Sequence, residues 1–196
     1  MLIDATETAR RILAGERLLL AAQEEVLLSL PAGNWIGGTI PYFMANDGGK
    51  ISRDQVFVHE IKGFSAPPIM RLYDADGLPQ LCRNAPENGF TILIIPAFSE
   101  CHGSFAENAP NYEDMYMKPV VGWISGIHLD DLGKVSPKVV LGTTGEFSEQ
   151  HAVAMDVPLP PNKFARVDII NLFRPGTGDT ITFAETGFSV GACQIN

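Results

Sequence analysis

Phe90-Thr-Ile-Leu-Ile-Ile-Pro96 is the most apolar run of the chain. Its apolar residues follow one another without alternating with polar ones, which is typical of a strand that is covered on both faces. Pro96 ends the run, because proline has no N–H to donate to a neighbouring strand. The run therefore predicts the central strand of a sheet with packed layers on both sides.

Shorter strand-like runs surround this central run, and helical segments lie between some of them. Residues 5–14 predict a helix that Asp4 caps and Gly15 ends, and residues 24–30 predict a second helix. Strand character is found at residues 18–21, 35–44, 55–61, 69–73, 90–96, 119–127, 139–142, 151–157, 166–173, 180–184 and 188–193. Residues 74–88 read as a long polar loop, and Asn108-Ala-Pro110 as the start of a late helix. This pattern predicts an α/β or α+β fold, a strand-rich mixed sheet with three or four helices.

Length and composition favour one domain over residues 1–196. No internal repeat and no compositional linker divides the chain, and 45% of its residues are hydrophobic, which is enough for a sizeable core. Charged residues make up only 19%, below the usual share of about 25%. A surface with few charges favours self-association, so a homo-oligomer is one predicted assembly.

The charge balance narrows the range of partners. The net charge is −9, and no basic cluster is longer than Arg10-Arg11, so a nucleic-acid partner is not expected. The acidic excess argues against anionic membranes, and no apolar run approaches the roughly 20 residues that span a bilayer. The expected partner is a small molecule of unknown identity.

Three cysteines, Cys82, Cys101 and Cys193, are far apart and form no Cys-x-x-Cys motif. An odd, scattered set indicates neither a disulfide framework nor a zinc finger, and reduced thiols predict a cytoplasmic protein. His128, Asp130 and Asp131 are of types that bind divalent ions, but no second His/Asp set accompanies them, so no metal is predicted. No phosphate-binding glycine motif occurs either, and no cofactor is predicted.

The segment Asn34-Trp-Ile-Gly-Gly-Thr39 has two glycines within a strand-like run. Consecutive glycines remove both Cβ atoms and weaken a strand, so they usually mark a bulge or a close approach of a ligand or another strand. We expect a bulge at Gly37 and Gly38 whose freed N–H groups hold a polar ligand group. Close packing of a second strand is the alternative explanation.

The segment Ser99-Glu-Cys-His-Gly-Ser104 follows the central strand, where α/β sheets often place their ligand sites. A thiolate at Cys101 with His102 as its base would form a nucleophilic pair. The competing interpretation makes Ser99 a helix cap with a half-buried thiol behind it. Both interpretations place a polar loop at the end of the central strand.

A pocket built from three segments is the combined hypothesis. Aromatic side chains cluster in or beside these segments, and small-molecule pockets are largely apolar with a few polar groups. The predicted ligand-binding residues are Asn34, Trp35, Gly37, Gly38, Thr39, Ser99, Ser104, Trp123 and His128.

Pro119-Val-Val-Gly-Trp-Ile-Ser-Gly-Ile-His-Leu-Asp-Asp131 resembles the glycine-rich segment of FIST-type bacterial sensory domains, which ends in an acidic pair. Gly142-Thr-Thr-Gly-Glu-Phe-Ser-Glu-Gln-His-Ala-Val-Ala-Met155 is similar to the glycine turn and following strand of that family, and the segment 34–39 is loosely similar to its small-residue segment. FIST domains are usually longer, so the resemblance implies a compact sensory module that binds a small ligand such as an amino acid.

Three functions follow as hypotheses from the sequence. The first is a small-molecule-binding or sensory module of bacterial type without catalytic activity. The second is a cysteine-dependent enzyme that uses Cys101 with His102 or His128 on an acyl or amide substrate. The third is a structural homo-oligomer without a small ligand.

Overall fold

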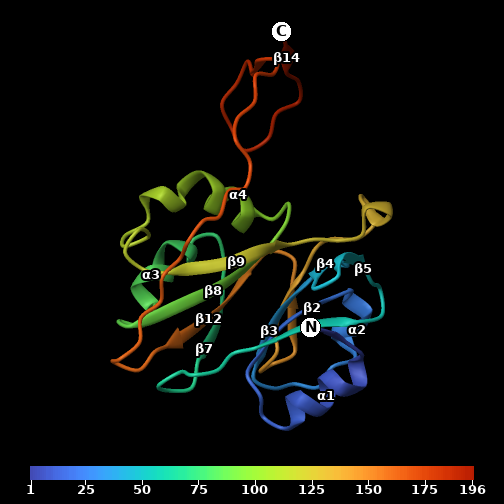
Figure 1. The fold of residues 1–196 in the computed structure, drawn as a ribbon, viewed down its shortest axis with the longest axis vertical. Coiled ribbons are helices and arrows are strands. Elements are labelled where there is room, and N and C mark those ends of the chain that lie inside the picture. Colours follow the sequence, from blue (N-terminus) through green and yellow to red (C-terminus); the bar gives the residue numbers. More distant parts are fainter.

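The computed structural model describes residues 1–196 and has an α+β fold built around two sheets (Figure 1). The first sheet has the strand order β1-β6-β2-β3-β10-β11, and the second has the order β7-β12-β8-β9. The first sheet consists of β1 (Leu2–Ile3), β6 (Val56–Glu60), β2 (Leu18–Ala22), β3 (Trp35–Thr39), β10 (Val139–Leu141) and β11 (Glu146–Ser148). The second consists of β7 (Ile69–Tyr73), β12 (Ala152–Pro158), β8 (Gly89–Pro96) and β9 (Val120–Ser125). The predicted fold class, a strand-rich mixed architecture with a few helices, is confirmed.

The helices lie on the outer faces of the two sheets, so the body has four layers (Figure 1). The four α-helices are α1 (Ala5–Leu13), α2 (Glu24–Leu28), α3 (Leu81–Asn84) and α4 (Glu100–Asn108). Short 3-10 turns are η1 (Leu78–Gln80), η2 (Ala109–Asn111) and η3 (Leu129–Asp131). Two small hairpins lie outside the main sheets, namely β4 (Tyr42–Ala45) with β5 (Gly48–Ile51), and β13 (Ile181–Thr182) with β14 (Gln194–Ile195).

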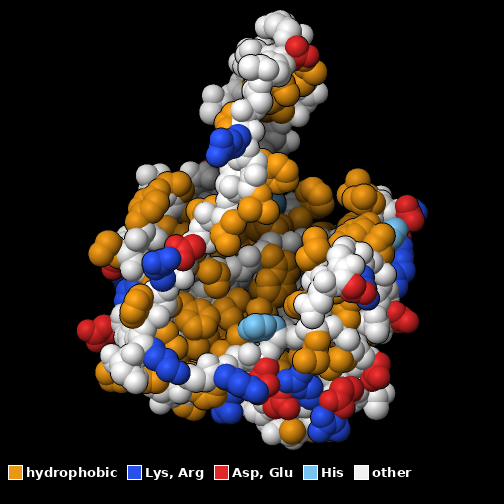
Figure 2. All heavy atoms as spheres, in the orientation of Figure 1, with side chains coloured by type: hydrophobic (Ala, Val, Ile, Leu, Met, Phe, Trp, Pro, Cys, Tyr) orange, Lys and Arg blue, Asp and Glu red, His pale blue; other side chains and the backbone are white.

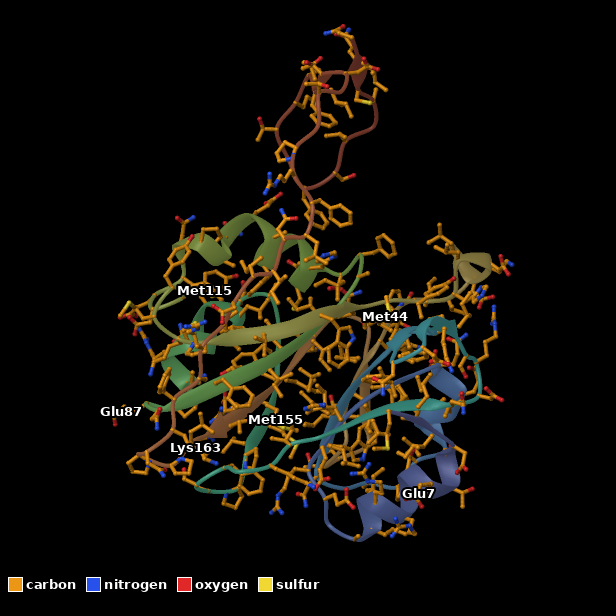
Figure 3. All side chains as sticks on the ribbon, viewed as in Figure 1. Glu7, Met44, Glu87, Met115, Met155 and Lys163 are labelled. Atoms are coloured by element: carbon orange, nitrogen blue, oxygen red, sulfur yellow. The ribbon has the colours of Figure 1, made fainter.

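Alternation along the strands divides the core into three parts. On β3, Trp35 belongs to the cluster beneath α1 and α2, whereas its neighbour Ile36 belongs to the cluster between the sheets. Met155 of β12 is fully buried in this middle cluster, between the two sheets (Figure 3). Each strand residue therefore faces either a helical layer or the opposite sheet, as the two-residue period of a strand requires.

The predicted central strand is confirmed at β8. It pairs with β12 on one edge and with β9 on the other. Ile92 and Ile94 lie in the cluster between the sheets, while Leu93 and Ile95 lie beneath α3 and α4. Both faces of the strand are buried, which explains its unbroken apolar sequence.

The two sheets overlap only in part. The main contacts between them come from β3 and β10, which lie against the strands of the second sheet. β2 and β6 lie on the other side of β3 and have helices on their outer face only. Their inner face is therefore left largely open.

Several local predictions are wrong. Residues 35–44 form two strands instead of one, since Pro41 separates β3 from β4. The loop predicted at residues 74–88 contains η1 and α3, which bury Leu78 and Leu81 beneath the second sheet. The helix after Ser99 begins at once and ends at Asn108, the point where the sequence predicted a helix start.

The C-terminal part of the chain leaves the layered body. Residues 166–173 were predicted as a strand but pair with nothing, and residues 166–196 are all exposed. The side-chain amide of Asn88 donates to the backbone oxygens of Leu159, Pro160 and Lys163, so the root of this tail is held at the start of β8. Figure 3 shows Lys163 at this root, and Figure 1 shows the tail extending past α4. The one domain predicted over residues 1–196 thus consists of a layered body and a tail.

Gly38 lies where the two sheets approach most closely on β3. A Cβ atom at this position would be 2.8 Å from Ile94 Cγ2 and 3.0 Å from the Cβ of Ser125, both on the second sheet. Gly103, on α4, is the opposite case, because a Cβ there has no neighbour within 4 Å. One glycine is required by packing, and the other only weakens its helix.

We expect Gly38→Ala to lower the free energy of unfolding by about 1–3 kcal/mol, because the added methyl group pushes the sheets apart. The matched control Gly103→Ala has the same chemical change in open space, and we expect it to raise that free energy by about 0.5–1 kcal/mol. Urea unfolding of both variants measures the two effects. A Gly38→Ala protein as stable as the unmodified chain would contradict the packing explanation.

Candidate functional site

A cavity of about 370 Å³ opens beside the place where the sheets meet. Ten of its eleven lining residues are hydrophobic, and the eleventh is His59. Figure 2 shows a hollow in this face of the molecule with hydrophobic side chains on its walls. Its volume and lining lie within the range of small-molecule sites in proteins.

The floor of the cavity is the open inner face of the first sheet. Leu18 and Leu20 of β2 point to the helical layer, so Leu19 and Ala21 between and after them face the cavity. The same alternation on β6 places Phe57 and His59 on the floor. Because β2 and β6 lie beyond the overlap of the sheets, these inner-face side chains are only partly covered, Leu19 by the cluster between the sheets and Phe57 by Phe43 of the hairpin β4–β5.

The hairpin β4–β5 forms a second wall. The ring of Phe43 stacks on Phe57, with centroids 5.8 Å apart and planes 6° apart. Tyr42 stacks on His128 at 5.5 Å, and its hydroxyl oxygen accepts a hydrogen bond from the Leu129 N–H at 3.0 Å. The hairpin is thus joined both to the cavity floor and to the loop that follows β9.

Trp123 and Ile124 of β9 form the third wall. The indole N–H of Trp123 and the hydroxyl of the fully buried Ser125 have no hydrogen-bond partner. Leaving such a group unsatisfied costs about 1–3 kcal/mol. The indole N–H of Trp123 points toward Gly38, since a Cβ on Gly38 would lie 3.5 Å from Trp123 Nε1, so this donor is buried between the sheets and not on the cavity surface.

The three-segment pocket predicted from the sequence is not formed. Of the nine predicted ligand-binding residues, only Trp123 lines the cavity. Thr39 lines a separate small hollow, where its hydroxyl oxygen accepts from the Lys138 N–H at 2.9 Å. Ser99 lines another hollow and caps α4 by accepting from the His102 N–H. Ser104 is half-buried on α4, and His128 stacks on Tyr42 outside the cavity lining.

The bulge expected at the two glycines is also wrong. Gly37 pairs with Leu20 of β2 and Val140 of β10, and Gly38 continues both ladders in regular register. Their backbone groups are therefore in the sheet ladders and not presented to a ligand. The alternative explanation, close strand packing, accounts for both glycines, since a Cβ on Gly37 would lie 2.8 Å from the Leu20 carbonyl oxygen.

Trp35 and Asn34 are also structural in this fold. Trp35 is 1% exposed, lies beneath the helices, and donates its indole N–H to the Pro31 carbonyl oxygen at 3.0 Å. Gly142 lies against this ring, because a Cβ there would be 2.3 Å from Trp35 Cδ2. The Asn34 carbonyl oxygen accepts from the Leu18 N–H at the start of the strand pair.

The predicted catalytic pair of Cys101 and His102 is wrong as well. Cys101 is fully buried beneath α4, where its thiol contacts the Tyr73 carbonyl oxygen at 3.4 Å. Burial raises the pKa of the Cys101 thiol, which disfavours the reactive thiolate. His102 is the next residue of α4, about 100° around the helix, where its Nδ1 accepts from the Phe98 N–H and its ring meets Phe188 edge-on. No hydrogen bond joins the imidazole to the thiol, so the structure does not show the two as a catalytic pair.

Asp156 is a buried ionisable group that was not predicted from the sequence. Asp156 of β12 is 3% exposed and accepts a 2.6 Å hydrogen bond from the Thr91 hydroxyl, and its other oxygen pairs with Arg71. Burial raises the pKa of Asp156, against the opposing effects of Thr91 and Arg71. A single carboxylate within the otherwise apolar run Ala152–Pro158 was the available signal. Thr91 and Arg71 saturate both oxygens, which indicates a structural ion pair.

Comparison with known proteins gives one match. Residues 3–196 match the model of a family of unknown function, DUF6976. The chain belongs to this family. No curated protein and no solved structure matches it. The match to DUF6976 includes the tail as well as the layered body.

Two further observations describe this DUF6976 member. No group of three His, Cys, Asp or Glu side chains is placed to hold a metal ion. Asp131 is one of the three residues, with His128 and Asp130, whose side chains are of types that bind divalent ions. Its carboxylate forms an ion pair with Arg53 at 2.9 Å. None of the helices has both the length and the apolar character needed to cross a bilayer.

Alkylation of the cysteines tests the placement of Cys101. We expect iodoacetamide near neutral pH to modify the exposed Cys193 at least tenfold faster than Cys101 and Cys82, because burial raises the pKa of both buried thiols. Mass spectrometry of the folded protein over time measures the three rates. Modification of Cys101 as fast as Cys193 would restore the nucleophile hypothesis.

The pH dependence of stability tests the buried carboxyl group. Burial raises the folded-state pKa of Asp156, so the folded protein favours the protonated carboxyl group. The stability that this preference contributes is fully present below the unfolded-state pKa of about 3.9. It is lost as the pH rises through the folded-state pKa. Asp156→Asn has no carboxyl to ionise, so we expect this variant to gain stability relative to the unmodified chain from about pH 4 to about pH 7. Urea unfolding across that range measures the difference. A loss of stability in Asp156→Asn over this range would mean that the ion pair with Arg71 has a larger effect on the pKa of Asp156 than burial has.

Proposed function

We propose that this protein is a small-molecule-binding module without catalytic activity, and that its ligand occupies the cavity between β2, β6, β9 and the hairpin β4–β5. The observation that carries the proposal is the cavity itself, about 370 Å³ in volume with ten hydrophobic lining residues out of eleven. Other hollows of the molecule have similar volumes, but fewer than half or only half of their lining residues are hydrophobic. The apolar lining is therefore what distinguishes this cavity as a ligand site.

The lining supports an apolar or aromatic ligand with one or two polar atoms. Phe43, Phe57 and Tyr42 present aromatic faces, on which flat apolar groups stack well. His59 is the one lining residue that is not hydrophobic, and the Tyr42 hydroxyl already accepts from the Leu129 N–H. A strongly charged ligand would lose its hydration there without sufficient compensation.

A sensory role is the extension of this proposal that the FIST resemblance predicts. Tyr42 lines the cavity and also contacts His128 and the Leu129 N–H of η3. A ligand that moves Tyr42 would therefore displace the loop after β9. Ligand binding in the cavity would in this way change the conformation of an exposed loop.

The cysteine-dependent enzyme receives no support from the geometry, since Cys101 is buried and no hydrogen bond joins it to His102. The structural homo-oligomer remains a second candidate. The exposed apolar tail favours it, and it does not exclude a ligand in the cavity.

A cavity-filling variant tests the proposed site. Ala21 is 7% exposed and lies on the floor, so Ala21→Phe places a ring in the cavity. The probe is N-phenyl-1-naphthylamine, an uncharged aromatic dye whose fluorescence rises in apolar sites. We expect Ala21→Phe to weaken probe binding at least tenfold, because the introduced ring takes the volume that the probe needs.

The control variant is Ala32→Phe, which adds the same ring at an exposed position outside the cavity. Both variants keep the tail, so probe bound to the tail contributes equally to both measurements. We expect Ala32→Phe to bind the probe as the unmodified chain does. Equal binding by all three proteins would place the probe elsewhere and contradict the proposed site.

A further inference from the structure

The tail has an apolar segment that nothing covers. Within residues 164–173 six large hydrophobic side chains are exposed. Their exposed fractions are 81% for Phe164, 46% for Val167, 93% for Ile169, 81% for Ile170, 84% for Leu172 and 85% for Phe173. Contiguous apolar surface of this kind marks an interaction site in a soluble protein.

The segment has the sequence of a buried strand. In extended conformation, Ile169 and Phe173 lie on one side with Asn171, and Ile170 and Leu172 on the other with Asp168, so both faces are largely apolar. Pro175 follows soon after and limits the length of such a strand. In the isolated chain, however, these residues pair with no strand. The segment is thus a strand without a sheet.

The free edge of β9 is a sheet position without a strand. β9 is the last strand of the second sheet and pairs only with β8. Val121 and Ile124 on this edge are 40% and 39% exposed, which leaves apolar surface there. The edge also presents unpaired backbone groups to any added strand.

An added strand beside β9 would meet apolar surface on its inner face. The second sheet has four strands and the first has six, and β9 borders the cavity whose floor is formed by β2 and β6. The next position beyond β9 therefore borders the cavity. Figure 2 shows hydrophobic side chains both on the tail and around the hollow. A segment that is apolar on both faces suits this position.

The chain's own tail does not reach this position in the structure. Asn88 holds residues Leu159 and Lys163 at the start of β8, and the tail then leads past α4 and away from the body (Figure 1). A second copy has the same free edge and the same free tail. Exchange of tails between two copies satisfies both features and closes the assembly at a dimer.

The area involved is sufficient for a stable dimer. Burying the five apolar side chains within residues 167–173 removes on the order of 500 Å² of tail surface from water. Two tails and the two surfaces that receive them then bury on the order of 2,000 Å² in total, at the upper end of standard-size interfaces. Each copy has a net charge of −9, but Asp168 is the one charged residue within residues 167–173, and it pairs with Arg166 at 2.7 Å.

We propose that residues 167–173 of one copy add as a strand to the free edge of β9 in a second copy, reciprocally, to form a homodimer. This assembly goes beyond ligand binding and does not depend on it. A monomeric protein in solution would contradict the dimer. Unchanged probe binding by the cavity-filling variant would contradict the proposed function.

Sedimentation analysis of the full chain tests the proposal. Reducing agent is included, so that no disulfide between exposed Cys193 side chains is counted as the dimer. We expect the unmodified chain to be dimeric at micromolar concentrations, and the double variant Ile169→Glu/Ile170→Glu to dissociate at least tenfold more readily. Both positions are exposed in the isolated chain, so folding of the body is preserved. The control Met117→Glu changes a residue that is 79% exposed on the body, and we expect it to remain dimeric.

A mixing experiment identifies the receiving edge. Ile124→Lys places a charge beside the free edge of β9 and leaves the tail intact, and we expect this variant alone to be monomeric. Mixed with the tail variant, it should form heterodimers, because one intact tail then meets one intact edge. A monomeric unmodified chain, a dimer that survives the tail variant, or a mixture that stays monomeric would each overturn the proposal. So would a monomer whose residues 167–173 are protected from hydrogen exchange, since the tail would then dock on its own body.

Discussion

The close contact of Gly38 with the second sheet is the constraint on which the rest of the structure depends. Without a Cβ, β3 lies directly against Ile94 of β8 and Ser125 of β9. β3 is the fourth strand of six in the first sheet, so a four-stranded sheet anchored there covers β3 and β10 and leaves β2 and β6 uncovered. The cavity is the direct consequence of this offset. Its floor consists of side chains that a second sheet lying over the whole of the first sheet would have buried.

The same offset explains why the edge of β9 lies beside open apolar surface. In a sheet pair of equal width, the inner face of an edge strand packs on the opposite sheet. Here the inner side of β9 borders the cavity, and its outer side continues into the layer of α3 and α4. Ligand binding and tail exchange are therefore two proposals about neighbouring parts of one surface. Each addresses apolar area that the isolated chain leaves exposed.

The sequence was sufficient for the fold class and for most elements that obey a local rule. The run 90–96 predicted a strand buried on both faces, and Asp4 and Gly15 predicted the limits of α1, where Asp4 accepts from the Glu7 N–H and Gly15 has φ +80°. Short helices such as α3 were missed, because they are stabilised by burying Leu81 under the sheet and not by local propensity. The strand at 166–173 was predicted from composition alone, whereas strand formation also requires a neighbour.

The candidate site was largely beyond the sequence. Glycine pairs mark close backbone approach, but the sequence does not say whether a ligand or a strand approaches, and at Gly37 and Gly38 it is a strand. Ser99, Cys101 and His102 are close in sequence, but Ser99 caps α4, the Cys101 thiol contacts the Tyr73 carbonyl oxygen, and the His102 ring accepts from the Phe98 N–H. The cavity residues Leu19, Phe57 and Trp123 come from three distant strands whose spatial order no local pattern reveals. Only Trp123 was predicted, through its aromatic ring in a glycine-rich strand.

Xenon binding in a crystal tests most directly the claim that the offset sheets leave an apolar cavity. Xenon enters dry apolar cavities without requiring any specific contact. Diffraction from crystals under xenon pressure should show a peak between Leu19, Phe57 and Trp123, and Ala21→Phe should remove that peak. An unmodified protein with no xenon at this place, and with the second sheet covering β2, would contradict the account.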